Sequence, residues 1–406
     1  MIEKNICVIG LGYIGLPTAA LLANKGYNVF GVDLNENVVS TINNGEIHIV
    51  EKDLALFVKS AISDKKLKAF NKVQKSDVYM ICVPTPFHQE GKIPQPNIDY
   101  VIAATKSIAT FIKSGDLIIL ESTSPVGTTK KIQKILIESS TDLNDVYIAY
   151  CPERVLPGKI MDELIENDRI VGGLDPLSTS KVKEFYSSFV NGDIIETDAQ
   201  TAEMCKLAEN SFRDVNIAFA NELSIICDKE GINTPKLIEL ANKHPRVNIL
   251  QPGIGVGGHC IAVDPWFIIS QHMESAKLMH TAREVNIYKT LWVLEKIKIA
   301  IINHTSVKGL KPKIACLGLA FKPNIDDLRE SKALEIAENL NAEGYEVYAV
   351  EPNIHEHKNL SLVDLYEAIE KADIVCILVK HREFVRSDIK KKLKKYNALD
   401  FCGALL

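Results

Sequence analysis

The alternation of apolar and polar positions divides the first part of the chain into short strands and longer helices. Residues 6–15 form an apolar run that ends in glycines, and the apolar positions from Leu16 to Leu22 then recur with helical spacing. Segments of helix length separate further strand-like runs at residues 29–32, 78–83, 117–120 and 146–149. Strands that alternate with helices in this way predict a parallel sheet covered on both faces over about the first 190 residues.

The middle of the chain is predicted to be helical. From Thr201 to about Asp228 it carries neither Gly nor Pro, and its apolar residues have helical rather than alternating spacing. We expect helices to continue to about His304. They are interrupted at residues 251–260, where the glycines of the sequence cannot sustain a helix.

The last hundred residues repeat the pattern of the first hundred. The run that begins at Ile314 resembles the run that begins at Cys7, and residues 344–351 and 371–379 resemble residues 26–33 and 75–83. The pattern therefore predicts an α/β fold in which a central helical region with a long connecting helix joins two Rossmann-like, doubly wound parallel-sheet domains. The expected domains cover residues 1–195, 196–305 and 306–406.

Composition and charge exclude several kinds of partner. Hydrophobic residues make up 46% of the chain and charged residues 24%, which is the balance of a folded globular protein. The net charge of −5 provides no long-range attraction to nucleic acid or to an anionic membrane. The first residues lack a basic segment followed by an apolar run, and no stretch reaches the roughly 18 apolar residues that span a bilayer. We therefore expect a cytoplasmic protein that binds neither nucleic acid nor membrane.

The nine cysteines lack the paired spacing of a zinc site, so no metal is expected. Cys7, Cys82, Cys316 and Cys376 lie in apolar runs and are expected to be reduced core residues. A cysteine outside an apolar strand is therefore a candidate for chemistry.

The glycines after the first strand predict a dinucleotide site. Gly10-Leu-Gly-Tyr-Ile-Gly15 places Gly10, Gly12 and Gly15, with Tyr13 and Ile14, between a strand and a helix, where backbone can approach a pyrophosphate closely. Asp33 ends the second strand about twenty residues further on, where a carboxylate binds the adenosine ribose and disfavours the 2′-phosphate of NADP. The expected cofactor is NAD.

The repeated unit lacks these glycines. Gly318-Leu-Ala-Phe-Lys-Pro puts Ala320 and Phe321 where a pyrophosphate would approach and offers Lys322 as a positive charge. The sequence predicts a ligand with a different phosphate geometry, although a scaffold that has lost its site is the alternative.

The glycine-rich segment that ends at Cys260 is the candidate for covalent chemistry. The cysteine follows Gly257-Gly-His, and Asp264 comes four residues later. A thiol beside a hydride acceptor suggests an aldehyde-level step, in which the thiolate adds to a carbonyl, hydride leaves, and water hydrolyses the resulting thioester. A cation is needed for the developing oxyanion, and the long helix supplies Lys206. The alternative for any single cysteine is an inert core residue.

Several further motifs resemble those of the UDP-glucose/GDP-mannose dehydrogenase family over nearly the whole chain. They are Gly10 to Pro17, residues 83–86 (VPTP), 121–127 (ESTSPVG), 151–158 (CPERVLPG), 206–213 (KLAENSFR), 244–246 (HPR), 257–266 and 321–331 (FKPNIDDLRES). The resemblance implies an NAD-binding domain, a central domain through which a homodimer forms, and a C-terminal domain that holds the UDP part of a sugar nucleotide. It also implies two successive oxidations at sugar C6 and a role in polysaccharide biosynthesis.

The resemblance assigns roles to individual residues. Catalytic roles fall to Cys260 as nucleophile, Lys206 as acid/base and oxyanion partner, Asn210 as orienting residue, Asp264 in proton transfer and Glu153 in thioester hydrolysis. Cofactor contacts beyond the glycine loop fall to Thr85, Thr123 and Arg329. Substrate contacts fall to Arg154, Val155, Lys206, Asn210, Arg213, His244, Arg246, Gly257, Phe321 and Lys322. The structural alternatives are surface ion pairs for the cations, a solvated helix face for Lys206 and a helix cap for Asp264.

The residues around Cys260 resemble the branch of the family that acts on N-acetylmannosamine nucleotides, with UDP-N-acetylglucosamine and UDP-glucose as alternative substrates. Asp400-Phe-Cys-Gly403 departs from the Asp-x-(Arg/Lys)-Gly of many relatives, so the basic contact of those relatives is not expected there. Two other functions stay open. A two-electron hydroxyacid dehydrogenase would need no cysteine nucleophile, and a non-catalytic NAD-binding scaffold would need no reactive thiol.

Overall fold

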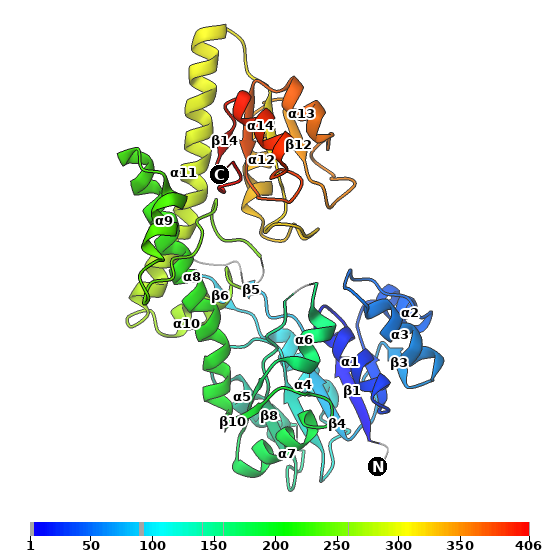
Figure 1. Ribbon diagram of the computed structural model, residues 1–406. Coiled ribbons are helices and arrows are strands. Elements are labelled where there is room, and N and C mark those ends of the chain that lie inside the picture. Colours follow the sequence, from blue (N-terminus) through cyan, green and yellow to red (C-terminus); the bar gives the residue numbers. More distant parts are fainter. Residues whose placement is uncertain (1–3, 89–92, 140, 157, 259, 406) are drawn as a thin grey trace. The chain divides into compact units, whose positions relative to one another are not determined.

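The computed structural model describes residues 4–88, 93–139, 141–156, 158–258 and 260–405 (Figure 1). Contacts within the chain divide it into two compact units, Met1–Ala208 and Glu209–Leu406. The three-domain division expected from the sequence stays a prediction.

An eight-stranded sheet forms the centre of the first unit. Its strand order is β10-β9-β8-β7-β4-β1-β2-β3, and every neighbouring pair is parallel except β8 and β9. The strands are β1 Asn5–Ile9, β2 Asn28–Val32, β3 Leu67–Phe70, β4 Val78–Ile81, β7 Leu117–Leu120, β8 Tyr147–Tyr150, β9 Arg169–Gly173 and β10 Ile194–Asp198. The two-residue strands β5 Phe87–His88 and β6 Gln95–Pro96 pair separately.

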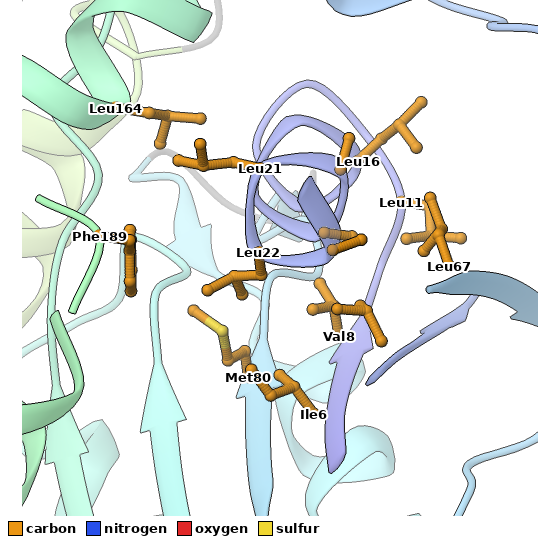
Figure 2. Packing of buried hydrophobic residues seen from close by; sticks show 14 of the residues in the cluster. Ile6, Val8, Leu11, Leu16, Leu21, Leu22, Leu67, Met80, Leu164 and Phe189 are labelled. Atoms are coloured by element: carbon orange, nitrogen blue, oxygen red, sulfur yellow. The ribbon is translucent and has the colours of Figure 1, made fainter. Parts of the chain in front are cut away.

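Helices cover both faces of this sheet. They are α1 Gly15–Asn24, α2 Glu36–Asn43, α3 Leu54–Ser63, α4 Asp99–Ile108, α5 Thr128–Glu138, α6 Ile160–Glu166 and α7 Pro176–Tyr186. One apolar cluster lies on each face, and Figure 2 shows Leu22 of α1 against Ile6 and Met80 of the central strands. Because every side chain of β4 and β7 is buried, these strands read as continuous apolar runs, as expected for a covered parallel sheet.

The second unit contains a smaller, wholly parallel sheet. Its strands are β11 Ile314–Leu317, β12 Val347–Val350, β13 Ile374–Ile377 and β14 Leu399–Asp400, in the order β12-β11-β13-β14. Strand β11 lies between β12 and β13, just as β1 lies between β2 and β4. The predicted repeat is therefore present in three dimensions, and the predicted α/β fold class is confirmed.

Two helices of 32 residues dominate the middle of the chain, α8 Ala199–Glu230 and α11 Lys277–Lys308 (Figure 1). The helix predicted from Thr201 to Asp228 lies inside α8. The remaining helices are α9 Thr234–Ala241, α10 Asp264–Gln271, α12 Lys332–Ala342, α13 Leu365–Lys371 and α14 Ser387–Lys395. Among the described residues, none of the helices is both long and apolar enough to cross a membrane.

A buried polar cluster joins α8 to α11 and holds the start of the glycine-rich segment. Arg283 donates to Asp214 at 2.6 Å, and Asn286 bonds both Asp214 and Asn221. Asn221 Oδ1 also accepts from the backbone N–H of Gly253 at 2.9 Å. This segment of loop is therefore anchored to the helices by side-chain hydrogen bonds.

Candidate active site

The glycine loop after β1 has the geometry of a dinucleotide site. A Cβ on Gly10 would lie 2.6 Å from the Cys82 carbonyl oxygen, and one on Gly15 would lie 1.8 Å from the Gly10 oxygen, so both positions need glycine because backbone passes close by. A Cβ on Gly12 would meet no atom of the described residues within 4 Å. The middle glycine therefore leaves open space at the start of α1, where a helix N-terminus favours an anion.

The acidic residue after β2 completes this site. Asp33 Oδ2 accepts from the Leu11 N–H at 3.1 Å, which places the carboxylate beside the glycine loop. Tyr13 packs against the core and Ile14 precedes the first turn of α1. These residues lie around the glycine loop, and their assignment to the ribose and pyrophosphate of NAD stays a prediction.

Thr85 and Thr123 follow neighbouring strands of the first sheet. The Thr85 hydroxyl donates to the Thr123 carbonyl oxygen at 2.7 Å, so the structure brings these two predicted cofactor residues together. Both are half-buried. They lie just beyond the carboxyl ends of β4 and β7, where ligands bind in open α/β sheets.

Lys206 and the loop after β8 form a second cluster in the first unit. The Lys206 Nζ donates to the main-chain oxygen of Glu153 at 2.7 Å. The Glu153 carboxylate is buried and pairs with Arg169 at 2.5 Å. Arg154 donates to the main-chain oxygen of Asp168 at 2.6 Å, and Val155 packs against the core.

The buried side of this cluster contains a second carboxylate. Glu121 accepts a hydrogen bond from the Tyr186 hydroxyl and another from the Cys82 thiol at 3.1 Å. Burial, together with the neighbouring Glu153 charge, raises the pKa of Glu121 to about 6. Two carboxylates thus lie near one guanidinium in the interior of this unit.

The predicted nucleophile lies in the second unit, at the start of α10. Cys260 is exposed, and its main-chain oxygen accepts from the Asp264 N–H at 2.8 Å. Asp264 is the first residue of α10 and is 2% exposed. Its Oδ2 accepts from Asn210 Nδ2 of α8 at 2.6 Å, so three predicted catalytic residues are close to one another.

The two glycines before Cys260 are required by tight packing. A Cβ on Gly257 would lie 2.5 Å from the Glu330 oxygen, and one on Gly258 would lie 2.8 Å from the Phe321 ring. Gly258, with φ of 81°, also donates its N–H to the Arg329 oxygen at 3.3 Å. The nucleophile segment therefore packs directly on the predicted substrate residue Phe321 and beside Arg329.

Positive charge gathers near this segment. Burial and the neighbouring Arg213 guanidinium lower the pKa of Lys322, while Asp327 and Cys260 act in the opposite direction. Two like charges placed close together favour a bound anion, as a diphosphate would be. The Arg329 side chain pairs with Asp327 at 2.6 Å.

His244 and Arg246 form no hydrogen bond with the residues of these clusters in the part of the chain that the structure describes. Both are exposed in the loop after α9, and the Arg246 N–H donates to His244 Nδ1 at 3.3 Å. Their assignment to the substrate stays a prediction.

A cavity of about 560 Å³ opens elsewhere in the second unit. Lys289, Trp292, Gln251 and Cys402 are among its lining residues, and none of the predicted substrate residues lines it. Burial lowers the pKa of Lys289 to about 8. Cys402, where the sequence departs from the family pattern, therefore lies in the wall of this cavity.

The repeated unit has lost the open glycine site for a definable reason. Glu351 occupies the position after β12 that Asp33 occupies after β2, and its Oε2 accepts from the N–H groups of Leu319 and Ala320. His381 Nε2 lies 3.1 Å from the same oxygen. Asp33 makes the equivalent bond to the Leu11 N–H, so the two units differ in that Glu351 also bonds the N–H of Ala320, which stands at the position of the open Gly12. The absence of dinucleotide geometry in this unit stays a prediction.

The sequence motifs assign no role to three charged residues of the interior, Arg169, Glu121 and Glu351. Each of them lies next to or at the end of an apolar strand. Such a position signals a buried charge, which is retained only when it is paired. Groups of His, Cys, Asp and Glu able to hold a metal ion are absent from the described residues.

The fold and these clusters define a dinucleotide-dependent oxidoreductase built on two Rossmann-type sheets. Models of the UDP-glucose/GDP-mannose dehydrogenase family match residues 4–190 as the NAD binding domain, 200–288 as the central domain and 315–405 as the UDP binding domain. The chain belongs to this family. The predicted family and the predicted NAD cofactor are thereby confirmed.

Individual relatives extend over nearly the whole chain. The UDP-N-acetyl-D-mannosamine dehydrogenase of Campylobacter jejuni is 53% identical over 94% of this chain and 96% of its own length. An NDP-N-acetyl-D-galactosaminuronic acid dehydrogenase of Ralstonia solanacearum is 50% identical over 95% of this chain and 92% of its own length. The solved UDP-D-ManNAc dehydrogenase of Pyrococcus horikoshii superposes with a TM-score of 0.89 at 37% identity, and the match covers 99% of this chain and 96% of that one.

Proposed function

We propose that the chain oxidises UDP-N-acetyl-D-mannosamine at C6 to the uronate and reduces two NAD for each sugar. The observation that carries the proposal is the exposed Cys260 beside the buried Asp264–Asn210 pair, in a chain more than half identical to UDP-N-acetyl-D-mannosamine dehydrogenases. UDP-N-acetylglucosamine and UDP-glucose are the alternative substrates. The Ralstonia relative, whose name refers to N-acetyl-D-galactosaminuronic acid, has a sequence identity to this chain that is almost as high.

Residues of this chain carry out the proton and covalent steps. NAD, when bound, supplies a hydride acceptor for each of the two oxidations. The Lys206 amine accepts the proton of the C6 hydroxyl in the first oxidation, and the resulting ammonium stabilises the oxyanion in the second. The Cys260 thiolate adds to the C6 aldehyde, and loss of the second hydride leaves a thioester. Water attacks that thioester and releases the carboxylate and the thiol.

The remaining polar groups hold the reactants. Asn210 and Asp264, already hydrogen-bonded to each other, orient the sugar or the attacking water, and Glu153 assists hydrolysis. Gly10, Gly12, Gly15 and Asp33 hold the cofactor. The UDP diphosphate binds Lys322, Arg213, Arg154, His244 and Arg246, of which the lysine and the arginines supply the local positive charge that an acidic protein needs for an anionic substrate.

We also propose that the chain works as a cytoplasmic homodimer. Phe212, Phe219 and Ile226 of α8 are 69%, 56% and 49% exposed. Their spacing of seven residues puts them on one face of the helix, and an apolar stripe of this kind favours association with another helix.

The first experiment is to measure NADH formed per sugar consumed, with each of the three UDP-sugars in turn. Two NADH per UDP-N-acetylmannosamine, with little turnover of the others, is the expected result. One NADH per sugar would exclude the thioester route and favour a two-electron dehydrogenase. Two NADH with a different sugar would keep the mechanism and change the substrate.

The Cys260→Ser variant tests the covalent step. Carboxylate formation should fall by about three orders of magnitude or more, because a serine hydroxyl is a much weaker nucleophile without an activating base. NAD binding, measured by fluorescence titration, should persist. Cys205→Ser, at a half-buried cysteine of α8, is the matched control and should turn over normally. Full turnover by the Cys260 variant is the result that contradicts the mechanism and would favour a scaffold or two-electron function.

A further inference from the structure

Arg169 is a buried cation that the roles assigned above leave unused. It is the first residue of β9 and is 2% exposed. Its NH1 lies 2.5 Å from Glu153 Oε2, its NH2 donates to the Leu164 oxygen at 3.1 Å, and its guanidinium faces the Tyr186 ring at 5.6 Å. A guanidinium held in several directions is a rigid anchor, because its planar fork fixes the position of each acceptor.

The charged and titratable groups around this guanidinium lie on several elements. Glu153, Cys151, Tyr186 and Glu121 all act on it. Burial alone would lower the pKa of Arg169, but these groups, Glu153 first among them, raise it above its ordinary value. Arg169 therefore stays a cation inside the unit, and Glu153 is its direct partner.

Both carboxylate oxygens of Glu153 point into the protein. Oε2 accepts from Arg169, and Oε1 accepts from the backbone N–H of Arg154 at 2.6 Å. The side chain is 6% exposed. The main-chain oxygen of the same residue is the group that accepts from Lys206 Nζ, at 2.7 Å. The side chain of Glu153 thus fixes the residue from inside while its carbonyl holds the lysine.

Other carboxylates fix the rest of this loop. Glu51 is 7% exposed and accepts from the N–H groups of Gly158 and Ile160 at 2.7 and 3.0 Å. Glu163 accepts from the Leu156 N–H at 2.7 Å. The loop is therefore held at both ends, and the Arg169–Glu153 pair is the anchor at the residue that meets Lys206.

We propose that Arg169 is a positioning residue for catalysis, which holds the Lys206 ammonium in place through Glu153. A lysine on a flexible four-carbon stem loses rotamer freedom when its ammonium is tethered, and one bond to a carbonyl leaves two N–H groups for the substrate oxygen. The inference rests on the proposed function of Lys206. It also gives the Glu153 carboxylate a positioning role through Arg169, in place of a direct part in thioester hydrolysis.

The test compares Arg169→Met with the native enzyme by the pH profile of kcat and by KM. We expect kcat to fall by about 100-fold, because a misplacement near 1 Å costs about that much, and its pH profile to shift. KM for the UDP-sugar and for NAD should change far less. In the Lys206→Met background the Arg169 substitution should cost almost nothing more, since it acts through the lysine.

A matched control separates positioning from loss of a buried charge. Glu203 lies one turn before Lys206 on α8, is fully buried, and accepts from Gly127 and Thr129. Glu203→Gln should lower thermal stability and keep the native pH profile of kcat. If Arg169→Met does the same, or if its cost is undiminished in the Lys206→Met background, Arg169 is structural and the proposal is wrong.

Arg169→Lys covers the case in which the methionine variant does not fold. Lysine keeps the positive charge, but a single ammonium does not replace the two guanidinium contacts to Glu153 and Leu164, so kcat should still fall by about 10-fold or more. A native kcat with a native pH profile would overturn the proposal. Failure here is distinct from failure of the proposed function. In the latter case, the native enzyme would form fewer than two NADH per sugar, or Cys260→Ser and Lys206→Met would keep the native turnover.

Discussion

Buried charges decide the chemistry and the stability of this protein at the scale of single residues. Glu351 and Asp33 occupy equivalent positions after the second strand of each sheet, yet they do different work. Asp33 is half exposed beside the open glycine loop, whereas Glu351 is 6% exposed and binds the Leu319 and Ala320 amides and His381. One carboxylate is available to a ligand, and the other stabilises the fold.

The pKa of Glu351 makes this role measurable. Burial alone would raise it, but the hydrogen bond and charge of His381 and the two amides lower the pKa of Glu351 from 4.5 to about 2. A carboxyl whose folded pKa is lowered stabilises the protein above its ordinary pKa, and this contribution is lost as the pH falls from about 4.5 towards 2.

Glu351→Gln should therefore destabilise the protein by about 3 kcal/mol at pH 7, at 1.36 kcal/mol per pKa unit. Thermal unfolding followed at pH 7, 5 and 3 should show the difference from the native protein shrinking as the pH falls. Glu343→Gln, which breaks the half-exposed pair with Lys298, is the control and should have a small effect at each pH. An equal loss at pH 7 and pH 3 would contradict the assigned charge state.

Single elements carry more than one task, and α8 shows this most clearly. One face supplies Lys206, Asn210 and the buried Asp214, while Phe212, Phe219 and Ile226 remain exposed. A 32-residue helix has room for a catalytic face and an association face because residues seven apart share one side.

Phe219→Glu should convert the proposed dimer to a monomer. A charge in the middle of an apolar stripe must be desolvated on association, which costs several kcal/mol. Light scattering after size exclusion would report the molar mass at several protein concentrations. Tyr396→Glu, at another exposed aromatic of the second unit, should leave the mass unchanged. A native protein that is already monomeric at high concentration would refute the proposed role of the stripe.

At the scale of the whole molecule, the chain uses one type of sheet twice for two kinds of ligand. The first unit keeps Gly12 open, and the second places Glu351 across the corresponding amides. Since each unit has its own sheet and core, the two ligands should stabilise the protein through separate sites.

Gly12→Val should abolish NAD binding and keep UDP binding. A Cβ at Gly12 would meet no described atom within 4 Å, so we expect the fold to tolerate valine there, but its side chain would fill the space of the pyrophosphate. Ligand at 100 times its Kd stabilises by about 2.7 kcal/mol. NAD should therefore raise the melting temperature of the native protein but not that of the Gly12→Val variant. UDP should raise the melting temperature of both. If NAD raised the melting temperature of the variant as much as that of the native protein, the cofactor would have to bind outside the glycine loop.

The sequence by itself determined the elements, the repeat of the two sheets, the NAD-type glycine loop and the family. These depend on local periodicity and on residues close together in the chain, as with Gly10 to Gly15 and the helix from Thr201. Only the tertiary structure decided that Glu153 turns its carboxylate towards Arg169 and its carbonyl towards Lys206, 53 residues away. The same is true of Glu351, which follows β12, because its partner His381 lies in the loop after β13. Hydrogen bonds between residues far apart in sequence have no local periodicity, so folding alone determines which buried charges meet.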